Sequence, residues 1–112
     1  ESAATETVQG FSSFSAFKRA NGPAGEGMAW HHIVEQNPVN KAQFAPEALH
    51  NTNNLIKIEH GAGSLHSKVT GYYNSKAILG YPGKVRDYVN TLSYQEQYEF
   101  GINVLKQYGW KP

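Results

Sequence analysis

The chain has 112 residues and no cysteine, which excludes disulfide bonds and thiolate metal ligands. Its formal net charge of +1 does not by itself indicate a nucleic-acid-binding protein, and no apolar stretch approaches the roughly 20 residues that a transmembrane helix needs. The length predicts one domain with a modest core. Because the chain contains five Phe and seven Tyr residues, we expect that core to be rich in aromatic side chains.

The N-terminal part predicts an arm, a helix and a loop. Residues 1–10 are small and polar, and we expect them to form a frayed arm. Residues 11–20 predict a short helix that is capped by one of the two serines at its start and carries Phe14 and Phe17 on one face. Glycines and a proline predict a loop over residues 21–27.

Two strands and a long connection follow. We expect the first strand at residues 29–34. The connection at residues 37–53 is too long for an ordinary hairpin loop, and it contains a helical turn that begins at Pro46. The alternation in residues 55–59 predicts a second strand, which we pair antiparallel with the first.

Three helices are predicted after the second strand. The first begins after Ser64, and the second covers residues 85–92. The third opens with a capping box at residues 93–96 and is expected to turn three side chains toward the core: Tyr98, Ile102 and Leu105. The predicted fold class is therefore α+β, with a two-stranded hairpin packed among several helices in a single domain over residues 1–112.

All five histidines fall within one third of the chain, at His31, His32, His50, His60 and His66. A strand alternates its side chains between two faces, but at a strand end the adjacent His31 and His32 can both reach one cleft. His66 lies in the first turn of a predicted helix, where the helix dipole favours the neutral imidazole that binds a divalent metal. The pattern predicts His31 and His66 as metal ligands, and His32 as the base for hydrolysis of a phosphodiester bond.

Basic residues are concentrated in the second half of the chain. From residue 57 to residue 86 the only acidic side chain is Glu59, against five basic ones: Lys57, Lys68, Lys76, Lys84 and Arg86. This distribution favours a face that binds nucleic acid. The alternative is a solvated surface with scattered lysines.

Three segments, taken in order, resemble the HNH superfamily of nucleases. They are residues 30–36 (WHHIVEQ), residues 50–56 (HNTNNLI) and residues 65–73 (LHSKVTGYY). More narrowly, they resemble the endonuclease VII-like His-His nuclease toxin domains at the C-termini of bacterial polymorphic toxins of the Rhs and contact-dependent inhibition kinds. The helices predicted near residues 14–18 and 97–105 look similar too, so the resemblance covers nearly the whole chain.

The resemblance implies a ββα-metal, treble-clef-like finger with residues 29–74 as its catalytic core. It implies that His31 is a metal ligand in the catalytic set and that His32 is the general base. Asn54 resembles the asparagine that steadies the loop and so orients the base, and His66 resembles the ligand on the helix.

The third metal ligand stays open. DNase colicins of this superfamily carry a further histidine four residues after the one on the helix, where this chain has Thr70. The candidates for the missing ligand are His50, His60, Asn51 or water, and His50 and His60 could instead be ordinary turn or surface residues. We expect one divalent ion, which could be Mg²⁺ with retained waters, Zn²⁺ or Ni²⁺.

The resemblance implies a DNA endonuclease toxin that acts in the cytoplasm of a target bacterium. Since the chain begins with Glu1 rather than Met, we expect it to be the C-terminal part of a larger secreted or surface-delivered protein. The implied partner is an acidic immunity protein; we expect a monomeric toxin domain and no membrane partner. Two alternatives stay open: a ribonuclease in which His32 and His66 act as base and acid without a metal, and a non-enzymatic module that binds nucleic acid or a metal.

Overall fold

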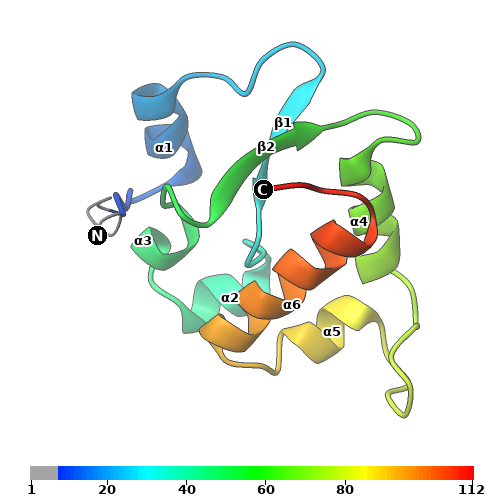
Figure 1. The fold of residues 1–112 in the computed structure, drawn as a ribbon. Coiled ribbons are helices and arrows are strands. Elements are labelled where there is room, and N and C mark those ends of the chain that lie inside the picture. Colours follow the sequence, from blue (N-terminus) through cyan, green and yellow to red (C-terminus); the bar gives the residue numbers. More distant parts are fainter. Residues whose placement is uncertain (1–7) are drawn as a thin grey trace.

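The computed structural model describes residues 8–112, so most of the expected N-terminal arm lies outside the described residues. In the described part the chain forms one two-stranded antiparallel sheet and six helices (Figure 1), which confirms the α+β class. The elements in chain order are α1 (Phe14–Asn21), β1 (Met28–His32), α2 (Pro38–Gln43), α3 (Pro46–Leu49), β2 (Leu55–Glu59), α4 (Leu65–Tyr73), α5 (Val85–Val89) and α6 (Tyr94–Gln107). Within residues 8–112, no helix combines the length and the hydrophobicity that crossing a bilayer requires.

The hairpin lies between two groups of helices. The predicted antiparallel pairing is confirmed, with His31 opposite Ile56 and His32 opposite Leu55. In Figure 1, α1 and α3 lie on one side of the hairpin, whereas α4 lies on the other. Because neighbouring side chains in a strand point to opposite faces, the two histidines of β1 turn toward these two different groups.

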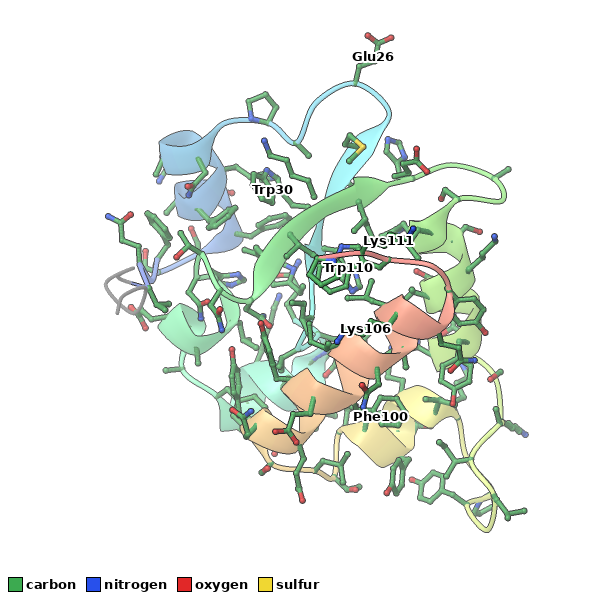
Figure 2. All side chains as sticks on the ribbon, viewed as in Figure 1. Glu26, Trp30, Phe100, Lys106, Trp110 and Lys111 are labelled. Atoms are coloured by element: carbon green, nitrogen blue, oxygen red, sulfur yellow. The ribbon has the colours of Figure 1, made fainter. Side chains whose placement is uncertain are left out.

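The main core fills the space between the hairpin and the last three helices. It consists of eight buried side chains: Ile33, Ile58, Val69, Tyr73, Val85, Val89, Val104 and Leu105. Full burial of one such aliphatic side chain stabilises the fold by about 1.5–3 kcal/mol. On the α1 side of the hairpin, buried Phe17 packs edge-on against Trp30, with 4.9 Å between the ring centroids; Trp30 is labelled in Figure 2. This contact anchors α1 to β1.

The helix α6 buries one of the three side chains that its hydrophobic pattern predicts to face the core, Leu105. The buried residues are Gln97, Gly101, Val104 and Leu105. Tyr98 and Ile102 are only partly buried at the edge of the core. Gly101 approaches the chain just after β1 so closely that an added Cβ would lie 2.7 Å from the carbonyl oxygen of Ile33. The face of α6 that points inward therefore depends on the close packing of Gly101 and on the buried amide of Gln97. A stripe of hydrophobic residues does not reveal either feature.

The long connection contains two short helices where the sequence predicts a loop with one helical turn. The helix α3 begins at Pro46, as predicted. The helix α2 begins at Pro38, after Asn37, whose side chain accepts a hydrogen bond from the Asn40 backbone N–H at 3.0 Å. An Asn-Pro pair is a recognised signal for a helix start. Asn40 is fully buried and donates to the Gln97 side chain at 2.9 Å, which ties α2 to α6.

The end of the expected arm is held by backbone pairing. The Gln9 N–H donates to the Thr52 hydroxyl at 3.0 Å, and Gly10 forms an isolated bridge with Asn51. The Phe11 N–H then donates to the carbonyl of His50 at 2.8 Å. The chain that leads into α1 therefore runs beside the segment that carries His50.

Candidate functional site

Four of the five histidines form two pairs at one end of the hairpin. The rings of His31 and His66 meet edge to face, with centroids 5.9 Å apart. The second pair is joined by a hydrogen bond, since Nε2 of His32 lies 3.1 Å from Nδ1 of His50. His60 is exposed and lies at the other end of the hairpin, next to the residue paired with Met28.

A pocket of about 200 Å³ brings the three predicted histidines together. It is lined by residues from the end of β1, from α4 and from α1, among them Phe14, His31, His32, Glu35, His66 and Thr70. Adjacent strand residues point to opposite faces, yet both histidines of β1 reach this pocket because the strand ends at His32. The expectation of one shared cleft at the strand end agrees with this geometry.

The first pair is suited to hold a ligand. Burial, and next the neighbouring His66, lower the pKa of His31 to about 4. His31 is therefore neutral at pH 7, and a neutral imidazole keeps a lone pair for a metal. Both rings border the pocket, so a small ligand could reach both histidines.

The second pair is more enclosed. Burial, and next His50, lower the pKa of His32 to about 3, and burial also lowers the pKa of His50. Both rings are therefore neutral at pH 7, and one N–H donates to the lone pair of the other ring. If Nε2–H of His32 is the donor, its Nδ1 keeps a free lone pair. His50, which the sequence leaves open as a ligand or a surface residue, is in fact 6% exposed and is the partner of His32.

The ring of Phe14 packs against both members of the second pair. Its centroid lies 4.8 Å from that of His32, edge-on, and 6.2 Å from that of His50, nearly parallel. Phe14 therefore shields the hydrogen bond between the two imidazoles from solvent. The sequence predicts Phe14 only as part of a helix face, because nothing in the local pattern relates α1 to the histidines.

Asn54 holds the backbone beside the second pair. It is fully buried, and its Oδ1 accepts from the Val34 N–H at 2.8 Å. Its Nδ2 donates to the carbonyls of Val34 at 3.0 Å and Leu49 at 2.9 Å. These bonds join the chain just after His32 to the chain just before His50. Asn54 lines neither pocket described here, so its geometry suits positioning rather than direct chemistry.

The predicted nucleic-acid contact Arg86 is engaged within the protein. Its Nε and Nη2 donate to the two carboxylate oxygens of Glu35 at 2.7 and 3.0 Å, and Nη1 donates to Asn74 Oδ1. The hydrogen bond from Arg86 to Glu35 raises the pKa of Arg86. Glu35 lines the pocket but is already paired, so it is a poor candidate for a metal ligand. The other predicted basic contacts are exposed: Lys57, Lys68, Lys76 and Lys84.

The donor set fits a metal site built from two histidines. Within residues 8–112 there is no group of three His, Cys, Asp or Glu side chains that could hold a metal ion. The structure does not bring His50 or His60 to His31 and His66 as a third ligand. The remaining positions of a divalent ion would therefore fall to water and substrate oxygens; imidazole ligands suit Zn²⁺ or Ni²⁺, whereas Mg²⁺ usually takes oxygen ligands and keeps several waters.

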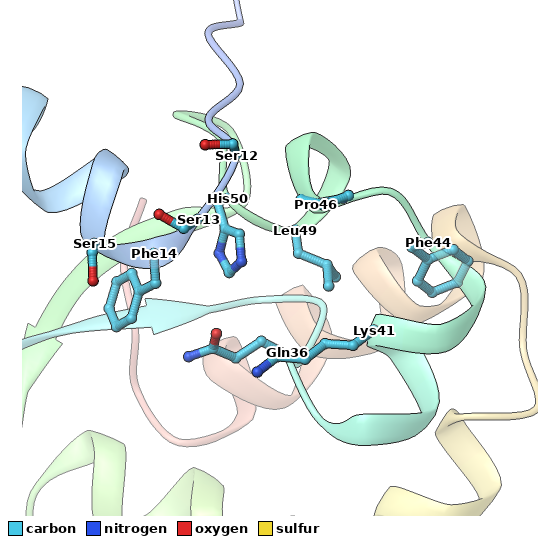
Figure 3. Close-up of a pocket in the computed structure, with 10 residues that line it drawn as sticks. All are labelled: Ser12, Ser13, Phe14, Ser15, Gln36, Lys41, Phe44, Pro46, Leu49 and His50. Carbon is cyan, nitrogen blue, oxygen red and sulfur yellow. The ribbon is translucent and has the colours of Figure 1, made fainter.

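A second pocket, of about 360 Å³, is shown in Figure 3, and it shares two lining residues with the first. Phe14 and Gln36 line both pockets. The second pocket is also bordered by Lys41 and Phe44, which belong to the connection that the sequence predicts as mostly loop. The signal that would have predicted their position is the Asn37-Pro38 pair at the start of α2. A helix predicted from that pair would have placed Lys41 in the helix and Phe44 at its end.

Comparisons of this chain with models of protein families, with curated proteins and with solved structures give no match. The resemblance to HNH nucleases in three sequence segments therefore stays a prediction. The functional interpretation depends on the residues and the geometry described above.

Proposed function

We propose that this domain is an HNH-type endonuclease that uses a divalent metal ion to hydrolyse phosphodiester bonds in DNA. The observation that carries the proposal is the convergence of His31, His32 and His66 in one pocket. Hydrolysis of a phosphodiester needs a base for the attacking water and positive charge at the phosphate. The pocket offers candidates for both. In this proposal β1, β2 and α4 correspond to a ββα-metal finger.

The roles of the residues follow from their environments. His31 and His66 would hold the ion, which when bound stabilises negative charge on the scissile phosphate and the leaving oxygen. His32 would accept the proton of the attacking water at a ring nitrogen that the hydrogen bond to His50 leaves free. His50 accepts the Nε2–H of His32 and thereby leaves Nδ1 of His32 as the basic atom. Asn54 positions the backbone that carries this pair.

The exposed lysines are suited to attract the substrate. The four that the sequence predicts as nucleic-acid contacts are Lys57, Lys68, Lys76 and Lys84. Contacts between lysine and phosphate release counterions, so binding should weaken as salt increases. We expect a smaller contribution from Arg86, because Glu35 and Asn74 already occupy its donors.

The biological part of the proposal is supported by the resemblance to polymorphic toxin domains. We propose that the domain is delivered as the C-terminal part of a larger secreted or surface-delivered bacterial protein and acts in the target-cell cytoplasm. An enzyme that cleaves DNA would also damage the cell that makes it. The producer therefore needs an immunity protein, and an acidic one could use the lysines that attract DNA.

A ribonuclease is the second candidate, and one observation favours it. Residues 8–112 contain two histidine pairs but no group of three metal-ligating side chains. RNA carries its own nucleophile in the 2′-hydroxyl group, so two imidazoles could act as base and acid without a metal. In that case His32 would be the base and His66 the acid.

The proposal is tested by incubating the purified protein with supercoiled plasmid and with total RNA. Each reaction is run with EDTA and then with Mg²⁺, Zn²⁺ or Ni²⁺ added back, and the His32→Ala protein prepared in the same way is the control for contaminating nucleases. We expect plasmid nicking that stops in EDTA and returns with metal. Degradation of RNA in EDTA with intact plasmid would support the ribonuclease instead. Cleavage of neither substrate would contradict both enzymes.

A further inference from the structure

The space of the second pocket has no role in the proposed hydrolysis, although His50 borders it and its size is that of a ligand site. Its volume of about 360 Å³ falls within the range of about 300–1,000 Å³ that is usual for such sites. Figure 3 shows Phe14 and Phe44 at its two ends, Gln36 and Lys41 along one edge, and Leu49 and His50 between them. Apolar walls with a few polar groups are typical of pockets that bind small molecules.

The two pockets are neighbours. Phe14 and Gln36 line both, and His32 in the first pocket is 3.1 Å from His50 in the second, measured between ring nitrogens. Groups bound in the two pockets would therefore lie side by side. In a strand of nucleic acid, a phosphate and a neighbouring base also lie side by side, because one sugar joins them.

The second pocket combines a cation with an aromatic wall. Lys41 is exposed, and the ion pair found within residues 8–112 is the one between Glu35 and Arg86, so Lys41 has no carboxylate partner there. Phe44 is partly exposed, and its ring is held edge-on by Tyr94 with 5.4 Å between centroids. Proteins that bind unpaired nucleic acid combine such features, because the cation contacts the phosphate and the ring stacks on the base.

We propose that the second pocket is a nucleotide subsite that takes one unstacked base of a DNA strand, with an adjoining phosphate on Lys41. The path of the strand from this subsite to His31, His32 and His66 rests on the proposed nuclease function. The base stacks on Phe44, and the amide of Gln36 can donate to and accept from its edge. A base within a duplex cannot enter such a pocket, so the bound strand is single-stranded or releases one base.

The test is nucleotide binding by the full chain in EDTA, followed by NMR. The probes are the four deoxynucleoside 5′-monophosphates, and deoxyribose 5-phosphate serves as the matched probe without a base. We expect the nucleotides to bind more tightly than the sugar phosphate and to shift the backbone signals of Lys41, Phe44 and His50. A single-stranded oligodeoxynucleotide should likewise bind more tightly than a blunt duplex of the same sequence.

Variants separate the base from the phosphate. Phe44→Ala should lower nucleotide affinity by about 5- to 150-fold, the range expected for loss of one stacked base, and leave the sugar phosphate unaffected. Phe44→Leu also removes the aromatic ring but keeps an apolar side chain, so it should lower nucleotide affinity too. It replaces the alanine variant if that variant does not fold. Lys41→Gln should weaken both probes. Lys106→Gln, which removes an exposed lysine from α6 (Figure 2), should weaken neither.

Equal affinities for nucleotides and for deoxyribose 5-phosphate would overturn the subsite, as would unchanged nucleotide binding in a folded Phe44 variant. Binding is measured in EDTA and without cleavage, so the two proposals can fail separately. Nucleotide binding by a protein that cuts no plasmid under any metal would keep the subsite and refute the nuclease. Plasmid cleavage together with nucleotide binding that does not change in a Phe44 variant would keep the nuclease and refute the subsite.

Discussion

The two sides of the hairpin treat neighbouring histidines differently. On the α4 side, His31 meets His66 across a pocket, and a ligand can reach both rings. On the α1 side, His32 is 7% exposed and is held by His50 and Phe14. The alternation of a strand thus gives two adjacent, chemically identical side chains different environments. In the proposed function, this difference corresponds to ligand binding by the first pair and proton transfer by the enclosed His32 in the second.

The contrast between the two histidine pairs is tested most strongly by removing the imidazole ring of His32. His32→Ala should lower the rate of plasmid nicking by about 10²- to 10⁴-fold, the usual contribution of a general base. Metal binding, measured by calorimetry, should change little, because the variant leaves His31 and His66 in place. Circular dichroism and thermal melting would verify that the variant is folded. Nicking at a near-wild-type rate by a folded His32→Ala protein would remove His32 from the mechanism.

Asn54→Ala should act on the enclosed side, since Asn54 secures the backbone beside His32 and His50. It leaves buried groups of Val34 and Leu49 without partners, and we expect a loss of unfolding free energy on the order of 3 kcal/mol. Urea denaturation measures this loss. Asn53→Ala is the matched control, because Asn53 is exposed and should change stability by less than about 0.5 kcal/mol. Equal stability of the two variants would show that Asn54 does not secure the site.

His66→Ala should affect only the open side. Loss of a residue that only hydrogen-bonds to a metal ligand lowers metal affinity by about 10- to 100-fold. Because His66 is proposed as a direct ligand, we expect a larger fall in metal affinity for His66→Ala. Isothermal titration calorimetry with the metal that supports nicking measures this change. His60→Ala, at the other end of the hairpin, should leave the affinity unchanged. Unchanged metal binding in His66→Ala would refute the assignment of the open pair as the metal site.

The smallest expected effect concerns the surface on the α4 side. The exposed Lys76 and Lys84 lie between α4 and α5, and their reversal to Glu should slow association with an acidic immunity protein by about tenfold at low salt. Stopped-flow association measured against ionic strength tests this, with Lys106→Glu/Lys111→Glu as a control of equal charge change. Rates that are flat with salt and indifferent to either reversal would show that the inhibitor recognises a different surface.

Much of the fold could be predicted because its signals are local. The serine caps are confirmed at three helices: Ser13, Ser64 and Ser93. The alternation of residues 55–59 predicts a strand that is confirmed with its antiparallel partner. The interior face of α6 could not be predicted in the same way, since buried Gln97 finds its partner in Asn40 only when α2 is in place.

In the candidate site, too, the contacts with a local sequence signal could be predicted and the others could not. The histidine pattern predicts that His31 and His66 approach one another, and their rings do meet in one pocket. The pairing of His32 with His50 had no local signal. It depends on the whole path of the long connection and on the hydrogen bond from the Phe11 N–H to the His50 carbonyl. Contacts of this kind arise from tertiary arrangement, which the periodicity of a single segment does not encode.

The division of labour between the two pairs is tested most directly by metal rescue. The nicking rate of the wild type, His66→Ala and His32→Ala is measured against the concentration of the activating metal. We predict that excess metal restores much of the rate of His66→Ala, because the remaining ligand still binds weakly, and that no concentration restores His32→Ala. Rescue of His32→Ala by metal, or wild-type cleavage that is unaffected by EDTA, would contradict the proposed metal-dependent mechanism.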